Sequence, residues 1–114
     1  MKIEKAVNIE KSAVEMEGAK GVEIRWLISK DDGAENFAMR MFEIQPGGHT
    51  PLHTHPQEHE VFVLEGKGVF AYEGQEHPFG PEHVIFVPPN EEHRFKNLGD
   101  SVLRMLCLVP LSTA

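Results

Sequence analysis

The chain has few of the residues that would build a disulfide framework or a membrane anchor. It contains one cysteine, Cys107, so no disulfide can form within its 114 residues. No apolar run approaches the roughly 20 residues needed to cross a bilayer. The opening segment, residues 1–5, lacks the apolar core of a signal peptide. These absences predict a cytoplasmic protein without a membrane partner.

Basic residues are also scarce, and they do not cluster. Eleven lysines and arginines stand against 18 acidic residues, which gives a net charge of −7. Nucleic acids and anionic membrane surfaces bind positively charged proteins, so this balance argues against both as partners. The 40% hydrophobic and 25% charged residues are typical of a globular protein. The length predicts one domain with one core.

Long amphipathic helices are missing as well, because no segment keeps an apolar period of 3.6 residues. Glycines and prolines instead separate short runs rich in Val, Ile, Phe and Met. The runs expected to form strands are 22–28, 37–44, 61–64, 69–72, 84–87 and 102–109. Short strands at this spacing predict an all-β sandwich or barrel. The glycines of segment 66–68 suggest a hairpin between two of them.

Several of these strands are apolar on both faces. Val61 and Val63 alternate with Phe62 and Leu64, and the run 84–87 has no polar residue at all. A strand with one solvated face would alternate between apolar and polar side chains. The second face must therefore be covered, either by another sheet of the same chain or by a second subunit. We favour a homodimer.

Seven histidines are present, and their spacing is informative. His53 and His55 are two residues apart, so in a strand both imidazoles would point to the same face. His59 follows after a bend at Pro56, and His93 follows a Pro-Pro-Asn turn. Four convergent imidazoles suit a divalent transition metal, and Mn, Fe, Co, Ni, Cu and Zn are all compatible.

The segment 47–66 resembles the first motif of the cupin superfamily. That motif runs glycine, five residues, His-x-His, three or four residues, glutamate, six residues, glycine. The residues that fit are Gly47, His53, His55 and Gly66, with His59 in the place of the glutamate. Glu60 takes that place if the longer gap is used, although only five residues then precede Gly66.

The segment 82–97 resembles the second cupin motif, which runs glycine, five residues, Pro-x-Gly, two residues, His, three residues, Asn. The residues that fit are Pro88, His93 and Asn97. Glu82 and Asn90 stand where glycines are usual. Asn tolerates a positive φ better than Glu does, so Glu82 is the larger departure.

The resemblance implies a double-stranded β-helix of jelly-roll type. Residues 1–36 would supply N-terminal strands, and 37–109 the barrel that carries the motifs, in one cupin domain spanning 1–114. One divalent metal is implied inside the barrel, held by His53, His55, His59 and His93. The match is closest to small cupins with four histidine ligands, in which manganese is common, so manganese is favoured. Four neutral imidazoles would leave the site at +2, where a carboxylate ligand would leave it at +1.

Four further residues are candidates for the surroundings of the metal. Arg40 would hold a substrate carboxylate if it faces inward, and would otherwise be a solvated strand charge. Glu60 would either orient an imidazole N–H or belong to the solvated loop. Cys107 and Phe95 would line the barrel near the metal or pack as ordinary core residues.

Cupins with such sites include dioxygenases, isomerases and decarboxylases that act on small organic molecules. The prediction is a metal-dependent enzyme of dioxygenase or other oxidative type. The alternatives are a metal-dependent isomerase or decarboxylase, and a non-catalytic module that binds a metal or a small ligand. Open coordination positions facing a pocket would favour catalysis, whereas a sealed tetrahedral site would favour a structural metal.

Overall fold

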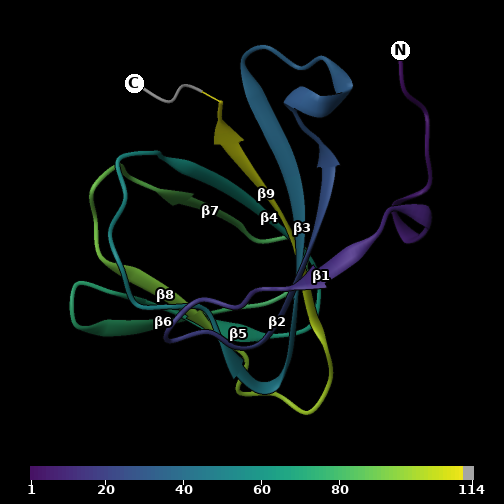
Figure 1. The fold of residues 1–114 in the computed structure, drawn as a ribbon. Helices are drawn as coiled ribbons and strands as arrows, with labels where there is room; N and C mark the ends of the chain where they lie inside the picture. The colour runs from purple at the N-terminus through teal and green to yellow at the C-terminus, as the bar shows by residue number, and fades with distance from the viewer. Residues whose placement is uncertain (112–114) are drawn as a thin grey trace.

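The computed structural model describes residues 1–111 and consists almost entirely of β-strands (Figure 1). The strands are β1 (Lys11–Ala13), β2 (Lys20–Ile28), β3 (Phe37–His49), β4 (His59–Glu65), β5 (Gly68–Tyr72), β6 (Gln75–Phe79), β7 (Val84–Val87), β8 (His93–Lys96) and β9 (Leu103–Pro110). Two short 3-10 turns cover Ala6–Asn8 and Lys30–Asp32. No helix in the described part of the chain could span a membrane. The all-β expectation is confirmed.

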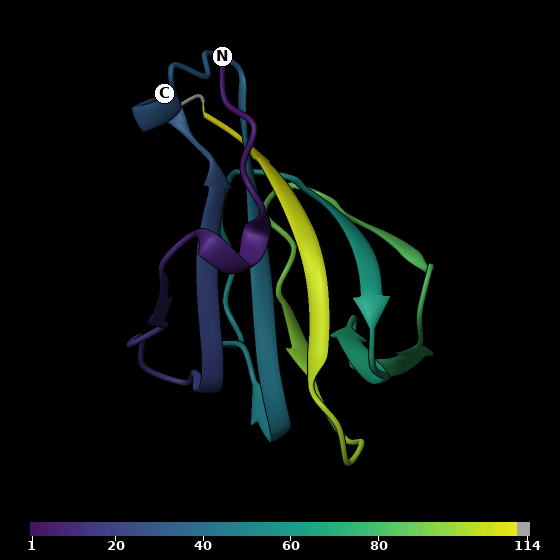
Figure 2. The same ribbon diagram turned by 90° about the vertical axis from the view of Figure 1, so that its right-hand side faces the viewer.

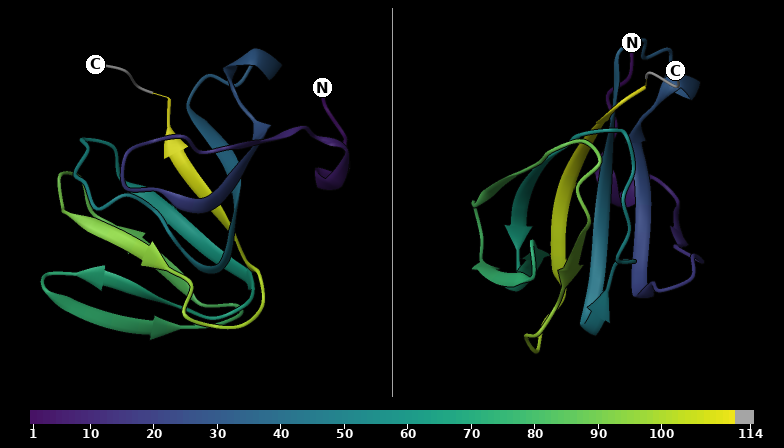
Figure 3. Two further views of the ribbon diagram at one scale, coloured as in Figure 1. Left: turned by 60° about the horizontal axis from the view of Figure 1, so that its bottom comes forward. Right: turned by 90° about the vertical axis from the view of Figure 1, so that its left-hand side faces the viewer.

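The strands pair in the order β6-β5-β8-β3-β9-β4-β7, with β2 added beside β3 and β1 beside β2. Figure 1 shows β5, β6 and β8 as one wall of the curled sheet and β4, β7 and β9 as the other. Strand β3 joins the two walls, because residues Phe37 to Ile44 pair with β9 while His49 pairs with Lys96 of β8. Figures 2 and 3 show β2, β3 and β9 side by side along the back of the curl.

Two glycines allow β3 to bend between the walls. Gly47 has a φ of +80°, a conformation that glycine adopts without cost. At Gly48, a Cβ would lie only 2.5 Å from the carbonyl oxygen of Lys20. The sequence predicted a turn here that would end the strand. The strand instead continues to His49 through a shift in its register with β2, because β2 remains paired on both sides of the bend.

The interior of the curl holds one hydrophobic cluster. Its buried members are Val22, Ile44, Val61, Val63, Phe70, Phe79, Val87, Phe95, Leu103, Met105 and Cys107. On β4 these inward side chains alternate with outward ones, and Phe62 and Leu64 are 39% and 37% exposed. One face of β4 therefore packs in the core, and the other remains open within the described chain.

The last residue of the second motif, Asn97, is a structural residue at the end of β8. Its side chain is completely buried. The amide nitrogen Nδ2 donates to the carbonyl oxygens of Ile44 and Ser101, each at 2.8 Å, and Oδ1 accepts from the backbone N–H of Gly99 at 2.9 Å. These bonds fix the loop between β8 and β9 against β3, because each satisfies a polar group that burial removes from water.

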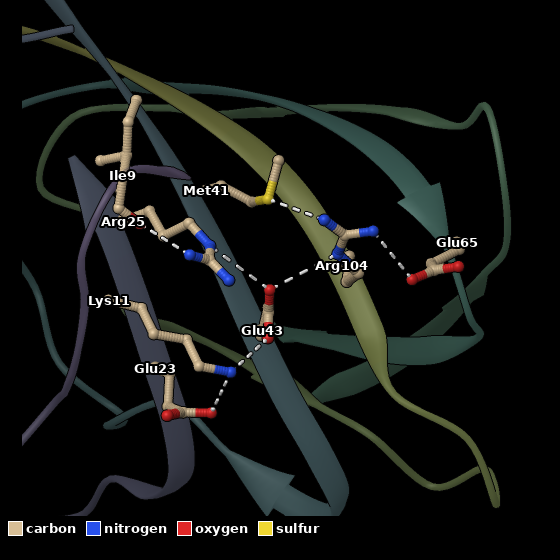
Figure 4. A network of polar contacts seen from close by, with 8 residues as sticks. All are labelled: Ile9, Lys11, Glu23, Arg25, Met41, Glu43, Glu65 and Arg104. Atoms are coloured by element: carbon tan, nitrogen blue, oxygen red, sulfur yellow. Dashed lines mark hydrogen bonds and ion pairs between the residues drawn. The ribbon is translucent and has the colours of Figure 1, made fainter. Parts of the chain in front are cut away.

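The outer face of β2, β3 and β9 carries a charge network centred on Glu43 (Figure 4). The Glu43 side chain is 11% exposed, and its carboxylate lies between three cations: Lys11 at 3.3 Å, Arg25 at 3.7 Å and Arg104 at 3.5 Å. Glu23 and Glu65 pair with the outer members of the network. Three carboxylates thus balance three cations, so this face is internally neutralised.

Candidate metal centre

The four histidines singled out by the sequence come from three segments that meet inside the barrel. His53 and His55 lie on the loop between β3 and β4, His59 begins β4, and His93 begins β8. All four line one pocket. The expectation that His53 and His55 share a strand is wrong, since the loop makes only an isolated bridge from His53 to His93. Prolines on both sides of this pair lack the N–H needed to extend a ladder.

The histidine side chains approach one another closely. Candidate ligand atoms of His55, His59 and His93 all lie within 4.8 Å of one another. The Nε2 atoms of His55 and His59 are 2.8 Å apart. His53 borders this group without joining it, with its ring centre 5.1 Å from that of His55 and 5.7 Å from that of His93.

Three of the four rings are oriented by the backbone in the same way. Their Nδ1 atoms lie within hydrogen-bond distance of carbonyl oxygens two residues away: His53 to Pro51 at 3.0 Å, His55 to Gln57 at 2.8 Å, and His93 to Glu91 at 2.9 Å. A carbonyl only accepts, so Nδ1 carries the proton and donates. Nε2 is then unprotonated, which is the form in which imidazole binds a metal.

His59 is held differently, because its Nδ1 faces an arginine. Nη2 of Arg40 lies 2.9 Å from this nitrogen, and a guanidinium can only donate. Nδ1 of His59 is therefore the acceptor, and the proton of the neutral ring sits on Nε2, from which it donates to Nε2 of His55. Arg40 also donates to Sγ of Cys107 at 3.1 Å, and Sγ lies 3.2 Å from Nδ1 of His59.

The surroundings favour the uncharged form of three of the imidazoles, those of His55, His59 and His93. Burial, aided by the positive charge of Arg40, lowers the pKa of His59 to about 3. Burial likewise lowers the pKa of His55 and of His93. Metal ligation requires the neutral ring, so lowered pKa values favour it. Burial raises the pKa of the Cys107 thiol, although Arg40 acts in the opposite direction.

The other candidates divide between the pocket and the outside. Arg40, Cys107 and Phe95 all line the histidine pocket, and Phe95 and Cys107 are buried. Glu60 is exposed and lines a separate hollow with Glu58, as expected for a residue that follows an inward His59 on the same strand.

Trp26 was not among the candidates from the sequence, but it lines the histidine pocket and is 47% exposed. Its pairing with Arg40 across β2 and β3 places both at the same point of the wall. Trp26 lies in an apolar run without local distinction, so no pattern of the sequence separates it from the core.

The pocket has a volume of about 420 Å³ and is mainly apolar. Its lining includes Trp26, Phe42, Phe95 and Met105 beside the four histidines. None of the described lining residues is an aspartate or glutamate, and Arg40 is the one permanently charged side chain among them. The histidine group therefore opens onto a sizeable hydrophobic space with a positive charge at its wall.

A curled antiparallel sheet that holds histidines inside it defines a class of small β-barrel binding protein. A family model for the cupin domain matches residues 40–109, and the chain belongs to this family. The expected cupin fold is confirmed.

Known relatives have different functions. The chain is 35% identical to an oxalate-binding protein of Thermotoga maritima over 101 residues, which cover 84% of this chain and 82% of the relative. It is similar in structure to the polyketide cyclase RemF of Streptomyces resistomycificus, with a TM-score of 0.93, 35% identity, and coverage of 98% of this chain and 80% of that one. A predicted oxalate decarboxylase of Thermotoga maritima has a TM-score of 0.86 at 27% identity, with 97% of this chain and 100% of that one covered.

Proposed function

We propose that His53, His55, His59 and His93 hold one divalent transition metal. The supporting observation is that three of these rings are already in the tautomer that leaves Nε2 free. An all-imidazole donor set suits ions of intermediate softness, so Fe, Co, Ni, Cu and Zn are compatible. Manganese is favoured by the resemblance to cupins with four histidine ligands. Such a metal would supply Lewis-acid polarisation of a substrate oxygen.

The chain is, in this proposal, a metal-dependent enzyme that acts on a largely apolar small molecule bearing a carbonyl group. The observation that carries the proposal is the 420 Å³ hydrophobic pocket onto which the histidines open. A structural metal would need no such space. The hydrophobic wall would exclude water, while the backbone carbonyls keep three of the imidazoles in place. Similarity to a polyketide cyclase supports a redox-neutral cyclisation or isomerisation.

Oxidation by a dioxygenase-type reaction is the second candidate. The apolar lining favours it, because O₂ partitions into hydrophobic space and none of the described lining residues is an aspartate or glutamate that would act as a base. Binding of a small dicarboxylate such as oxalate, suggested by the relative of that name, accounts less well for the pocket. Oxalate has no apolar surface and would leave most of the volume unfilled.

Two measurements on one sample separate these functions. The metal content of protein purified without a tag is measured by mass spectrometry, with the quadruple variant of the four histidines to alanine as control. The loaded protein is then incubated in D₂O with ortho-hydroxyacetophenone, which has a carbonyl, a neighbouring phenol and an enolisable methyl group. Deuterium entering the methyl group, followed by NMR without oxygen uptake, would support the redox-neutral reaction. Oxygen uptake would support the oxidative reaction. If neither deuterium incorporation nor oxygen uptake is observed, both candidate functions are contradicted.

We also propose that the protein is a homodimer formed through the outer face of β4 and β7. Phe62 pairs with Val84 across these strands, and they are 39% and 74% exposed. Leu64 and Phe86 extend the same face, at 37% and 56% exposed. Contiguous exposed apolar residues of this kind mark interaction surfaces. The face around Glu43 is less suited, because its charges are already paired within the chain.

A further inference from the structure

Arg40 introduces a positive charge that no residue of the described chain, 1–111, neutralises through an ion pair. Among the described residues, its Nη2 hydrogen-bonds to the His59 ring and the Cys107 thiol alone. Nε is buried without a hydrogen-bond partner, and Nη1 makes no hydrogen bond to another described residue. The described pocket lining contains no carboxylate that could pair with it. A half-buried charge that has no counter-charge among the described residues is costly, so the site as built lacks an anion.

Aromatic side chains hold the guanidinium in place. The Cζ atom of Arg40 lies 5.5 Å from the ring centre of Trp26 and 5.1 Å from that of Phe42. Both distances are within the range of cation–π attraction. Trp26 is the cross-strand partner of Arg40, and Phe42 follows it by two residues on the same face of β3. The side chain is thus fixed at the pocket wall before any ligand arrives.

We infer that the pocket binds an aromatic molecule carrying an anionic oxygen, and that Arg40 is the residue that selects for this charge. The inference rests on the proposed function and names its substrate class. The flat apolar walls formed by Trp26, Phe42 and Phe95 suit a ring system, and a carboxylate, phenolate or enolate oxygen would supply the missing counter-charge. A metal held by neutral imidazoles would reinforce this preference. The attraction is local, because the whole chain carries −7.

The test compares two ligands of nearly the same shape on metal-free protein prepared with a chelator. The ligands are 4-tert-butylbenzoate and its neutral amide, 4-tert-butylbenzamide, titrated by calorimetry. We expect the carboxylate to bind roughly tenfold to a hundredfold more tightly, as for a hydrogen bond to a charged group. Emission from Trp26, the one tryptophan of the chain, reports whether the ligand enters this pocket. Equal affinities for the acid and the amide would overturn the inference without requiring any variant.

Variants of Arg40 assign the preference to this residue. Arg40→Gln should abolish the preference for the acid while leaving amide affinity within about threefold, because the apolar walls remain. Arg40→Lys keeps the charge but loses the planar fork, so it should retain part of the preference. Lys67→Gln, on the loop between β4 and β5, removes the same charge at a distance and should change nothing. A full preference in Arg40→Gln would show that another group selects the anion.

The failure of this inference differs from that of the proposed function. If the protein retains no metal but still prefers the benzoate through Arg40, the metalloenzyme proposal fails and the anion pocket stands. If metal is bound at the histidines but acid and amide bind alike, the anion pocket fails and the metal site stands. Acetate and oxalate complete the set: if either binds metal-free protein as tightly as 4-tert-butylbenzoate, the aromatic part of the inference is wrong.

Discussion

At the scale of single residues, the main feature of the site is the contact between Arg40 and His59. The histidine occupies the position where the cupin motif has glutamate, and the arginine sets its tautomer through a 2.9 Å hydrogen bond. For His59 to bind a metal through Nε2, the proton now on that atom must move or leave. The other three histidines need no such rearrangement. Among the four proposed ligands, His59 is therefore the one whose metal binding would depend most on its neighbours.

Restoring the glutamate of the motif tests this position. In His59→Glu the carboxylate would face both the metal and Arg40, lowering the net charge of the loaded site from +2 to +1 and pairing with the guanidinium. We expect metal retention comparable to that of the wild type by mass spectrometry, because the number of ligands is preserved. Azide binding, followed by optical titration of the cobalt-loaded protein, should weaken by roughly tenfold, since a nearby charge in an apolar pocket is poorly screened.

Glu60→Gln is the matched control for that experiment. Glu60 is exposed and faces a different hollow, so its substitution should alter neither metal retention nor azide affinity. If Glu60→Gln strips the metal while His59→Glu leaves azide binding untouched, then Glu60 is the ligand and the assignment of His59 is wrong.

The lowered pKa of His59 predicts how the metal-free protein responds to acid. In the unfolded chain the ring titrates near 6.5, whereas burial holds the pKa near 3 in the folded protein. Below pH 6.5 the unfolded state takes up a proton that the folded state does not, so stability falls as the pH falls from 6.5 toward 3. Urea unfolding of chelated protein should show this loss, and His59→Leu should reduce it. An unchanged pH dependence in His59→Leu would contradict the low pKa.

At the scale of elements, glycines with a positive φ lie where one β-strand ends and the chain turns toward the next. Gly66 follows β4, has a φ of +89°, and would place a Cβ 2.5 Å from the carbonyl oxygen of Val102. Both its conformation and its contact with β9 require a hydrogen in place of a side chain. Gly74, in the turn between β5 and β6, has a φ of +73° but nothing within 4 Å. A side chain at Gly74 would therefore meet only the strain of a positive φ, whereas a side chain at Gly66 would meet both that strain and a steric clash.

Alanine substitutions at these glycines should differ in size. Gly74→Ala should destabilise the protein by about 1 kcal/mol, the cost of a left-handed residue. Gly66→Ala adds a clash with backbone that cannot rotate away, so we expect a loss of about 3 kcal/mol or more. Urea denaturation monitored by circular dichroism measures both. Similar losses in the two variants would show that β4 and β9 can separate at Gly66 without cost.

The sequence predicted the elements better than their connections. Six of the strands followed from apolar runs, but β1, β6 and β8 carry charged residues or proline and were missed. Strand β6 contains Pro78, which is tolerated because β6 is an edge strand with one unpaired side. The hairpin expected at Gly66 is absent, since β4 pairs with β7 and β9. The actual hairpin joins β5 to β6 through Glu73 and Gly74, both at positive φ.

The histidines of the candidate site could be predicted, because their spacing in the sequence matches two motifs. The double motif identified the histidines, and the structure brings them to one pocket. Glu82 and Asn90, which replace motif glycines, do adopt φ values of +67° and +65°. The sequence left open whether Arg40 faces inward or outward, because the direction of a strand charge depends on a register that only the folded sheet fixes. Its contacts with Trp26 and His59 depend on pairing across distant segments.

At the scale of the whole molecule, the two outer faces of the barrel differ in character. The back of the curl, around Glu43, is occupied by ion pairs (Figure 4). The outer face of β4 and β7 exposes large apolar side chains that the described chain leaves uncovered. A stable dimer buries roughly 1,000 Å² or more of surface, and exposed large apolar side chains are the kind of surface that subunit interfaces bury. This asymmetry makes the β4–β7 face the expected subunit interface.

A single charge on that face should separate the subunits. Light scattering at micromolar concentration should report twice 12.8 kDa for the wild type. Phe86, 56% exposed on this face, is the residue to change: in a two-fold dimer, Phe86→Glu would bury two carboxylates without partners and should yield a monomer. Leu98→Glu is the control, because Leu98 is 66% exposed on the loop after β8 and lies outside the face. A monomeric wild type would contradict the dimer. A dimer that survives Phe86→Glu but not Leu98→Glu would place the interface elsewhere.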